Sequence, residues 1–188
     1  RDATGALTSI NCLANKFGEE DLATLLTAIE GTSVRSLCGL TEGQTTADFS
    51  GQNLGPIDMK IMAAEYGFQG FIGAIAHLAL GSNPIGDEAM IPLLDTLKDI
   101  PLISFDISKT NCGVSTASKL AELLTDETKF RGALTSVVLD GNELSGTKIQ
   151  NKGQWDEQIE ELDADLSGFT EFCSSLKSST IVSLSLRK

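Results

Sequence analysis

Basic residues are scarce in this sequence. Its 188 residues include 26 acidic and 14 basic side chains, which give a formal net charge of −12 at pH 7. Nucleic acids and anionic membranes repel such a chain, so neither is an expected partner. We expect a protein partner instead, and the charge favours a basic one.

Long apolar runs are absent as well. No stretch approaches the ~18 apolar residues that a membrane span needs, and no signal-peptide pattern is visible. The hydrophobic content of 41% and the charged content of 21% are ordinary for a soluble globular protein. We therefore expect a soluble protein without membrane insertion. Because position 1 is Arg rather than Met, removal of a targeting segment stays open.

Cysteine and histidine are too few and too dispersed for a zinc site. The four cysteines, Cys12, Cys38, Cys112 and Cys173, lie far apart with no CxxC pair, and His77 is the only histidine. No metal or other cofactor is expected. Three of the cysteines fall at apolar positions of a repeat described below, where a free thiol behaves as a small hydrophobe. This usage favours an intracellular, reducing compartment.

One segment invites a nucleotide-binding interpretation. In "SVVLDGNELSGTK", residues 136–148, Gly141, Gly146 and Lys148 almost match a phosphate-binding loop. However, Thr147 precedes the lysine, whereas the pattern requires a hydroxyl residue after it. The alternative is that this segment is one turn of an internal repeat.

The repeat is found in four segments with apolar residues at relative positions one, four, six and eleven. They are "LTSINCLANKFG" from Leu7, "IAHLALGSNPIG" from Ile75, "LISFDISKTNCG" from Leu102 and "LTSVVLDGNELS" from Leu134. Position nine is Asn15, Asn83, Thr110 and Asn142. A weaker copy places Gln52 at position nine, and "IVSLSLRK" from Ile181 begins a further copy.

Each unit also has a second half with helical spacing. Seven, ten, eleven and fourteen residues past the polar position, apolar residues recur and predict an amphipathic helix. These residues are Leu22, Leu25, Leu26 and Ile29; Met59, Met62, Ala63 and Tyr66; Met90, Leu93, Leu94 and Leu97; Ala117, Leu120, Ala121 and Leu124. A last helix is expected around Phe169, Phe172, Cys173 and Leu176.

The strand-and-helix repeat resembles the leucine-rich repeat family, specifically its long ribonuclease-inhibitor type. The resemblance covers essentially the whole chain. It implies an α/β fold: a right-handed solenoid of about five to six repeats, with a concave parallel β-sheet and outer helices. It also implies that residues 1–188 form one domain, and the lack of visible polar caps favours a segment of a longer array.

In this family the asparagine at position nine hydrogen-bonds the backbone of the turn, because buried peptide groups must find partners. We therefore expect Asn15, Asn83 and Asn142 to be buried structural residues. The turns that carry Gln52 and Thr110 should be less well satisfied. Asn142 occupies this position within residues 136–148, so we interpret that segment as a repeat turn and expect no nucleotide affinity.

Two insertions interrupt the period. Residues 37–46 are rich in Gly and Thr, which suggests a loop or short hairpin. Residues 148–166 are rich in acids and contain Trp155, the only tryptophan. This second insertion is either a solvated helix or loop, or a recognition protrusion in which Trp155, Asp156 and Glu157 bind a partner.

Strand alternation predicts which side chains leave the core on the concave face. We expect three rows of mostly small residues: Ser9, Thr46, His77, Ser104, Ser136 and Ser183; Asn11, Asp48, Ala79, Asp106, Val138 and Ser185; Leu13, Ser50, Gly81, Ser108, Asp140 and Arg187. His77, Asp48, Asp106 and Asp140 are candidate binding residues. Because Asp48 and Asp106 should lie roughly 10 Å apart, with Ala79 between them, no catalytic or metal role is expected.

Three functions fit this sequence. The first is a non-enzymatic protein-interaction or scaffolding module, which is the usual role of a rigid repeat surface. The second is a structural subunit whose uncapped ends are buried in a large assembly. The third is a regulatory segment that senses a ligand or activates a GTPase, for which Arg35 and Arg131 are poor candidates.

Overall fold

The computed structural model describes residues 7–150, 155–156 and 158–187, and its centre is a five-stranded parallel sheet. The strand order in the sheet, β1-β2-β3-β4-β7, is the order in the chain. The mixed α/β class is therefore confirmed. The strands are β1 (Thr46–Asp48), β2 (His77–Ala79), β3 (Ser104–Asp106), β4 (Ser136–Val138) and β7 (Ser183–Ser185).

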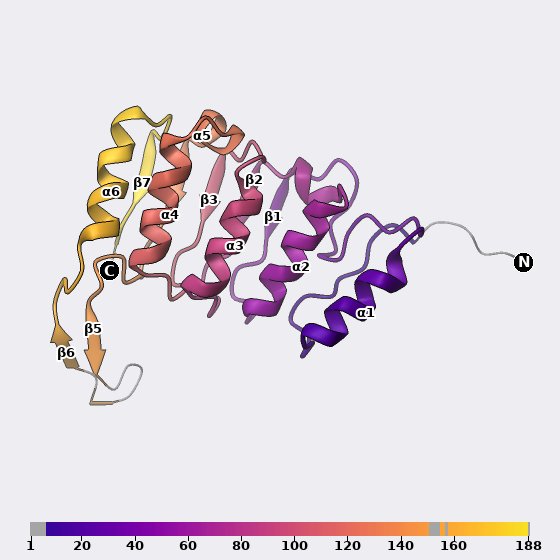
Figure 1. Cartoon of the computed structure of the whole chain (residues 1–188), viewed down its shortest axis with the longest axis horizontal. Helices are drawn as coiled ribbons and strands as arrows, with labels where there is room; N and C mark the ends of the chain where they lie inside the picture. The colour runs from indigo at the N-terminus through magenta and orange to yellow at the C-terminus, as the bar shows by residue number, and fades with distance from the viewer. Residues whose placement is uncertain (1–6, 151–154, 157, 188) are drawn as a thin grey trace, which may run out of the picture.

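One layer of helices covers one face of this sheet, and the helices follow one another in chain order (Figure 1). The predicted helices are all confirmed. They are α1 (Glu19–Ile29), α2 (Pro56–Gly67), α3 (Asp87–Leu97), α4 (Val114–Thr125) and α6 (Ser167–Ser175). Shorter elements complete the layer: α5 (Lys129–Ala133) and the 3₁₀ turns η1 (Phe71–Ala74) and η2 (Leu176–Ser178).

The core lies between the sheet and the helices. The middle residue of each of the first four strands is almost fully buried, and so are the inward residues of α3 and α4. Full burial of one Leu or Phe side chain stabilises the fold by about 1.5 to 3 kcal/mol. The expected apolar position at Cys173 is wrong, because this thiol is exposed, whereas Cys12, Cys38 and Cys112 are buried.

The sheet register confirms the first two rows from β1 onward. Thr46, His77, Ser104, Ser136 and Ser183 are consecutive partners, and so are the residues of the Asp48 row. The first members of these rows are misplaced in the sequence prediction. Ser9 forms an isolated bridge with Ser36 and Asn11 forms one with Cys38, so residues 36–38 lie beside residues 9–11.

This pairing changes the interpretation of residues 37–46, which are not merely a surface loop. Leu37, Cys38 and Leu40 are at most 2% exposed. The buried carboxyl group of Glu65 holds the segment, since its Oε2 accepts hydrogen bonds from Ser36 Oγ at 2.9 Å and from the Leu37 amide at 2.7 Å. The same Oε2 also accepts the Cys38 amide at 3.0 Å, and Glu65 Oε1 accepts the Ile72 amide at 3.0 Å.

The polar turn positions differ in burial. Asn83 is 1% exposed and Asn142 is half-buried, which agrees with a structural role. Asn15 is exposed, so the prediction that it is buried is wrong, although its Nδ2 still donates to the Cys12 and Leu13 carbonyls. The prediction for Gln52 holds, since within the described residues this exposed side chain makes a single long hydrogen bond, to the Asp48 carbonyl at 3.3 Å.

The second insertion is a β-hairpin, so the helix alternative is wrong. Strand β5 (Lys148–Gln150) pairs antiparallel with β6 (Gln158–Glu161), and the pair projects beyond the helical layer (Figure 1). All four residues of β6 are exposed. A strand, not a helix, follows Thr147, and Leu144 is buried, so the repeat-turn interpretation of residues 136–148 is supported.

Candidate functional site

The open face of the sheet brings three of the predicted site residues together. Asp48, His77 and Asp106 line a shallow hollow of about 340 Å³ with small neighbours, including Ala79 and Ser104. His77 Nδ1 lies 2.9 Å from Ser104 Oγ on the adjacent strand. Ala79 separates the two aspartates in the register, as expected.

The two aspartates of this hollow also stabilise the turns that follow their strands. Asp48 Oδ1 accepts a hydrogen bond from the Ser50 amide at 3.0 Å, and Asp106 Oδ1 accepts one from the Ser108 amide at 2.8 Å. The bonds from Ser50 hold the pKa of Asp48 below its usual range. A carboxylate with a lowered pKa stays ionised near neutral pH, so Asp48 is a hydrogen-bond acceptor there rather than a proton donor.

Asp140 does not join this hollow. It lies in the turn after β4, where its Oδ1 accepts the Arg187 amide at 2.7 Å and its Oδ2 lies 3.6 Å from Arg187 Nε. Hydrogen bonding from Ser185 and then from Arg187 holds the pKa of Asp140 below its ordinary value. Asp140 is therefore engaged in joining the β4 turn to the end of β7.

The hairpin presents the remaining predicted residues. Trp155 is 98% exposed and Asp156 is half-buried, while Glu157 lies outside the described residues. Lys148 Nζ forms an ion pair with Glu161 Oε2 at 2.6 Å across the two strands. The lysine of the apparent phosphate loop therefore has a carboxylate partner. The absence of nucleotide affinity stays a prediction, which titration with ATP and magnesium would test.

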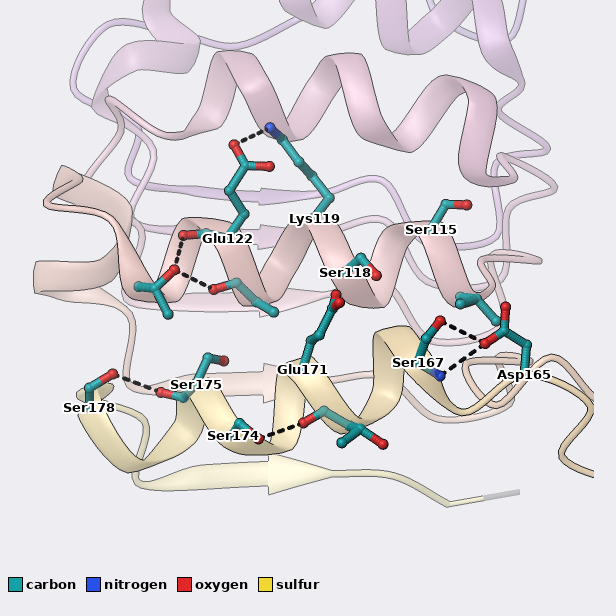
Figure 2. Close-up of a pocket in the computed structure, with 14 residues that line it drawn as sticks. Ser115, Ser118, Lys119, Glu122, Asp165, Ser167, Glu171, Ser174, Ser175 and Ser178 are labelled. Atoms are coloured by element: carbon teal, nitrogen blue, oxygen red, sulfur yellow. Dashed lines mark hydrogen bonds and ion pairs between the residues drawn. The ribbon is translucent and has the colours of Figure 1, made fainter.

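A third feature, which the sequence analysis did not predict, is a groove of about 960 Å³ between α4 and α6 (Figure 2). Ser115 and Ser118 line it from α4, and Glu171 and Ser174 line it from α6. The two helices approach closely at Gly168, where an added Cβ would lie 2.2 Å from the Val114 carbonyl oxygen. A signal was present in the small residues on the outer face of α4, but the repeat pattern describes only inward residues.

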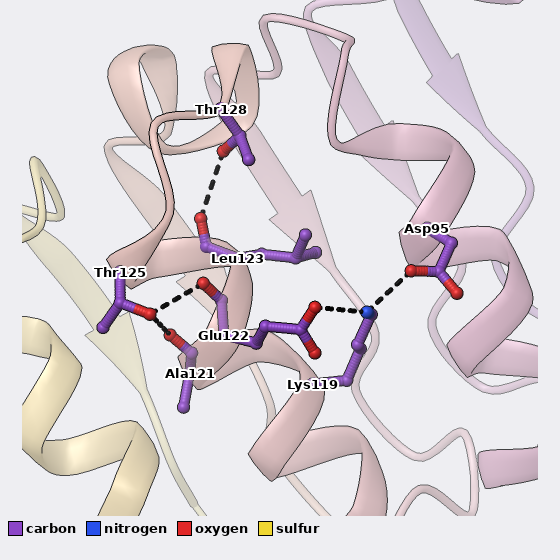
Figure 3. A network of polar contacts seen from close by, with 7 residues as sticks. All are labelled: Asp95, Lys119, Ala121, Glu122, Leu123, Thr125 and Thr128. Atoms are coloured by element: carbon purple, nitrogen blue, oxygen red, sulfur yellow. Dashed lines mark hydrogen bonds and ion pairs between the residues drawn. The ribbon is translucent and has the colours of Figure 1, made fainter.

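Lys119 lines the same groove, and its ion pairs connect α4 to α3 (Figure 3). Its Nζ lies 2.6 Å from Asp95 on α3 and 2.8 Å from Glu122 on α4, and its side chain is only 14% exposed. Hydrogen bonding to Asp95, and then to Glu122, raises the pKa of Lys119. This cation therefore contributes little positive charge for a ligand in the groove.

Comparison with known proteins adds no family to this picture. No protein-family model matches the chain, and no curated protein is significantly similar to it. In the described part of the chain, none of the helices has both the length and the apolar character required to cross a membrane.

Proposed function

We propose that this chain is a right-handed leucine-rich-repeat solenoid that acts as a non-enzymatic protein-interaction or scaffolding module. The support for the repeat is the sequential parallel sheet, the helix that follows each of its first four strands and the polar residue in each turn. Such an array offers a long, rigid surface rather than a deep cleft. Its sheet is the concave face in this proposal, and its helices form the outer face.

The exposed Trp155 carries the proposal about where a partner binds. Because Trp155 is 98% exposed, nearly all of the apolar surface of its side chain is available to a partner. Burial of ~200 Å² of aromatic surface contributes on the order of 5 kcal/mol before the costs of association. Asp156 and the acidic β6 residues Glu160 and Glu161 would raise the encounter rate with a basic partner.

The sheet hollow is a secondary contact in this proposal. Thr46, Ala79 and Ser104 offer little area to bury, but they let a partner backbone approach closely. Asp48, Asp106 and His77 can then supply hydrogen bonds to it. Their contribution should be mainly to orientation and specificity.

The test captures partners from a lysate of the source cells on the immobilised chain, at low and at high salt. We expect the parent chain to retain a partner at low salt and to lose it as salt rises, because charge steering is screened. The Trp155→Ala variant should lose most of the captured material. Ile159→Ala is the matched control, since Ile159 is also exposed, at 57%, on the same hairpin. Equal capture by all three chains would refute the hairpin as the binding site.

A second candidate, a structural subunit within a large assembly, is favoured by apolar residues near the sheet edge at β7. Val182 is 86% exposed and Leu186 is 42% exposed, beside the strand that ends the sheet order. In such a subunit, partners would cover this edge rather than the hairpin. The regulatory alternative has weaker support, because Arg131 is occupied by the Thr125 and Ser178 carbonyls.

The cysteines support a reducing, intracellular compartment as part of the proposal. Cys12, Cys38 and Cys112 are buried free thiols rather than disulfide partners. Burial raises the pKa of Cys38 and of Cys112, which keeps both thiols protonated and slow to react.

A further inference from the structure

The hairpin is a sheet of only two strands, so each of its strands has one unpaired edge. In the described part of the chain, β6 pairs with β5, and its backbone groups make no hydrogen bond to another segment. All four residues of β6 are exposed, and the hairpin projects beyond the layer of helices (Figure 1). The outer N–H and C=O groups of β6 are therefore accessible to a further strand.

Apolar side chains on and beside β6 are exposed as well. Ile159 in the strand is 57% exposed, and Leu162 directly after it is 58% exposed. Trp155, which precedes the strand, is 98% exposed. A two-stranded hairpin is marginally stable in water, whereas a third strand adds backbone hydrogen bonds and covers apolar surface. The hairpin therefore has both the open edge and the apolar side chains that a third strand requires.

The charge of β6 decides which strand fits this edge. Glu160 and Glu161 are adjacent, and Lys148 offsets Glu161 through an ion pair at 2.6 Å, so the strand keeps a negative charge. Pairing of β6 with β6 of a second copy would bring four carboxylates onto one short edge. Like charges on neighbouring strands are destabilising, and a chain with a net charge of −12 repels its own copies. A basic strand is favoured over a second copy.

We propose that β6 binds an extended segment of a partner polypeptide as the third strand of the hairpin. The segment carries basic residues opposite Glu160 and Glu161 and an apolar residue opposite Ile159. Backbone hydrogen bonds give the affinity in this mode of binding, and the side-chain pairs between the strands select the sequence. This inference rests on the hairpin being the binding element of the proposed function, and it specifies the conformation and the sequence pattern of the partner.

The probe for this edge is the peptide acetyl-TVKKVT-amide, added to the ¹⁵N-labelled chain. Its sequence reads the same in both directions, so a valine and two lysines can face Ile159, Glu160 and Glu161 in parallel or antiparallel pairing. We expect saturable shifts of the β6 amide resonances. Hydrogen exchange should slow at alternate β6 amides, because every second N–H of a strand faces the same edge.

A chemically matched peptide tests the backbone pairing. N-methylation of the two valines and the two lysines keeps every side chain and charge but removes four backbone donors. We expect this peptide to bind at least about tenfold more weakly, because its backbone can no longer pair with β6. Equal binding of the two peptides would overturn the strand-pairing proposal while leaving recognition by the hairpin intact.

Protein variants test the sequence pattern. Glu160→Lys should weaken binding of the unmodified peptide at least about fivefold, because like charges then face each other. Glu171→Lys, at an exposed position of α6, is the control for net charge and should bind nearly as the parent does. Equal weakening by the two substitutions would show that general attraction, and not strand pairing, holds the peptide.

Trp155→Ala separates this inference from the proposed function. The variant should keep the alternate exchange protection at β6 when the peptide binds, even if it captures no less from a lysate than the parent does. Absence of shifts at millimolar peptide would overturn the inference. Protection of β6 amides that rises with the concentration of the chain alone would also overturn it, since the edge would then pair with a second copy.

Discussion

The segment from β2 to α4 and the hairpin of β5 and β6 differ in how much of their surface is buried. In the turns from β2 to α4, Met90, Leu94 and Phe105 are at most 1% exposed, and Asn83 makes hydrogen bonds to two turns. In the hairpin, β6 is exposed along its whole length. Its ion pair joins two side chains, Lys148 and Glu161, that are 61% and 53% exposed. Exposed pairs of this kind contribute about 0 to 1 kcal/mol.

This difference separates stability from recognition. A substitution in the central turns should weaken folding without changing the outer surface, because the affected groups contact only the protein itself. A substitution in the hairpin should leave folding intact and change only what the chain binds.

Glu65→Ala should be the most damaging single substitution considered. It removes the acceptor for Ser36, Leu37, Cys38 and Ile72 and leaves buried donors unsatisfied. We expect a loss of about 3 to 5 kcal/mol in the free energy of unfolding, measured by urea denaturation. Glu171→Ala on the exposed face of α6 is the control, with a change within about 0.5 kcal/mol. A loss below ~1 kcal/mol for Glu65→Ala would contradict this role.

Asn83→Ala should reduce the free energy of unfolding by about 1 to 3 kcal/mol, since the Leu54 amide and the Phe49 carbonyl lose their partner. Gln52→Ala is the matched control at the equivalent turn position, because Gln52 is exposed and makes one long hydrogen bond. Its effect should stay below ~0.5 kcal/mol. Equal effects of the two substitutions would show that burial of the amide is not what stabilises the turn.

Lys119→Met should cost more stability than Lys60→Met, although both lysines form ion pairs with neighbouring helices. Lys119 is 14% exposed and has two carboxylate partners, whereas Lys60 is 50% exposed and has Glu19. We expect a loss of about 1 kcal/mol for Lys119→Met and less than half of that for Lys60→Met. Thermal unfolding at low and high salt would measure both, and the reverse order would refute the comparison.

Asp48→Asn should have a small effect that depends on pH. Because the folded pKa of Asp48 is lowered, its contribution is present above the unfolded pKa of ~3.9 and is lost as pH falls through the folded value. Parent and variant should therefore differ slightly at pH 6 and converge in strong acid, as followed by urea denaturation. A difference that persists at pH 2 would mean that the Ser50 hydrogen bonds are not the cause.

Much of the central architecture could be predicted because the repeat carries its own register. Each copy repeats the same apolar spacing, so His77, Ser104 and Ser136 align once the copies are superimposed. The prediction for the first repeat copy was wrong because local spacing does not reveal which segments lie side by side. Ser36, and not the expected Thr46, lies beside Ser9. The sequence feature that could have indicated this is Glu65, an acidic residue inside a predicted helix, whose carboxyl group binds the segment of Ser36 and Leu37.

The hairpin and the groove between α4 and α6 were harder to predict for a different reason. Residues 148–166 lack a period, so composition alone could not distinguish a helix from a hairpin. The groove depends on how closely two helices approach at Gly168, which is a property of packing between elements. The sites for which no periodicity exists are therefore the ones that only the structure could define.

Recognition through the hairpin is tested most directly by the fluorescence of Trp155 in a purified complex with a captured partner that itself lacks tryptophan. If the hairpin is the recognition element, the emission maximum should shift to shorter wavelength and acrylamide quenching should fall, because the exposed indole becomes buried. The free energy of unfolding of Trp155→Ala should meanwhile stay within about 0.5 kcal/mol of the parent. A tight complex in which Trp155 keeps its emission and its full quenching would show that the hairpin is not the recognition element.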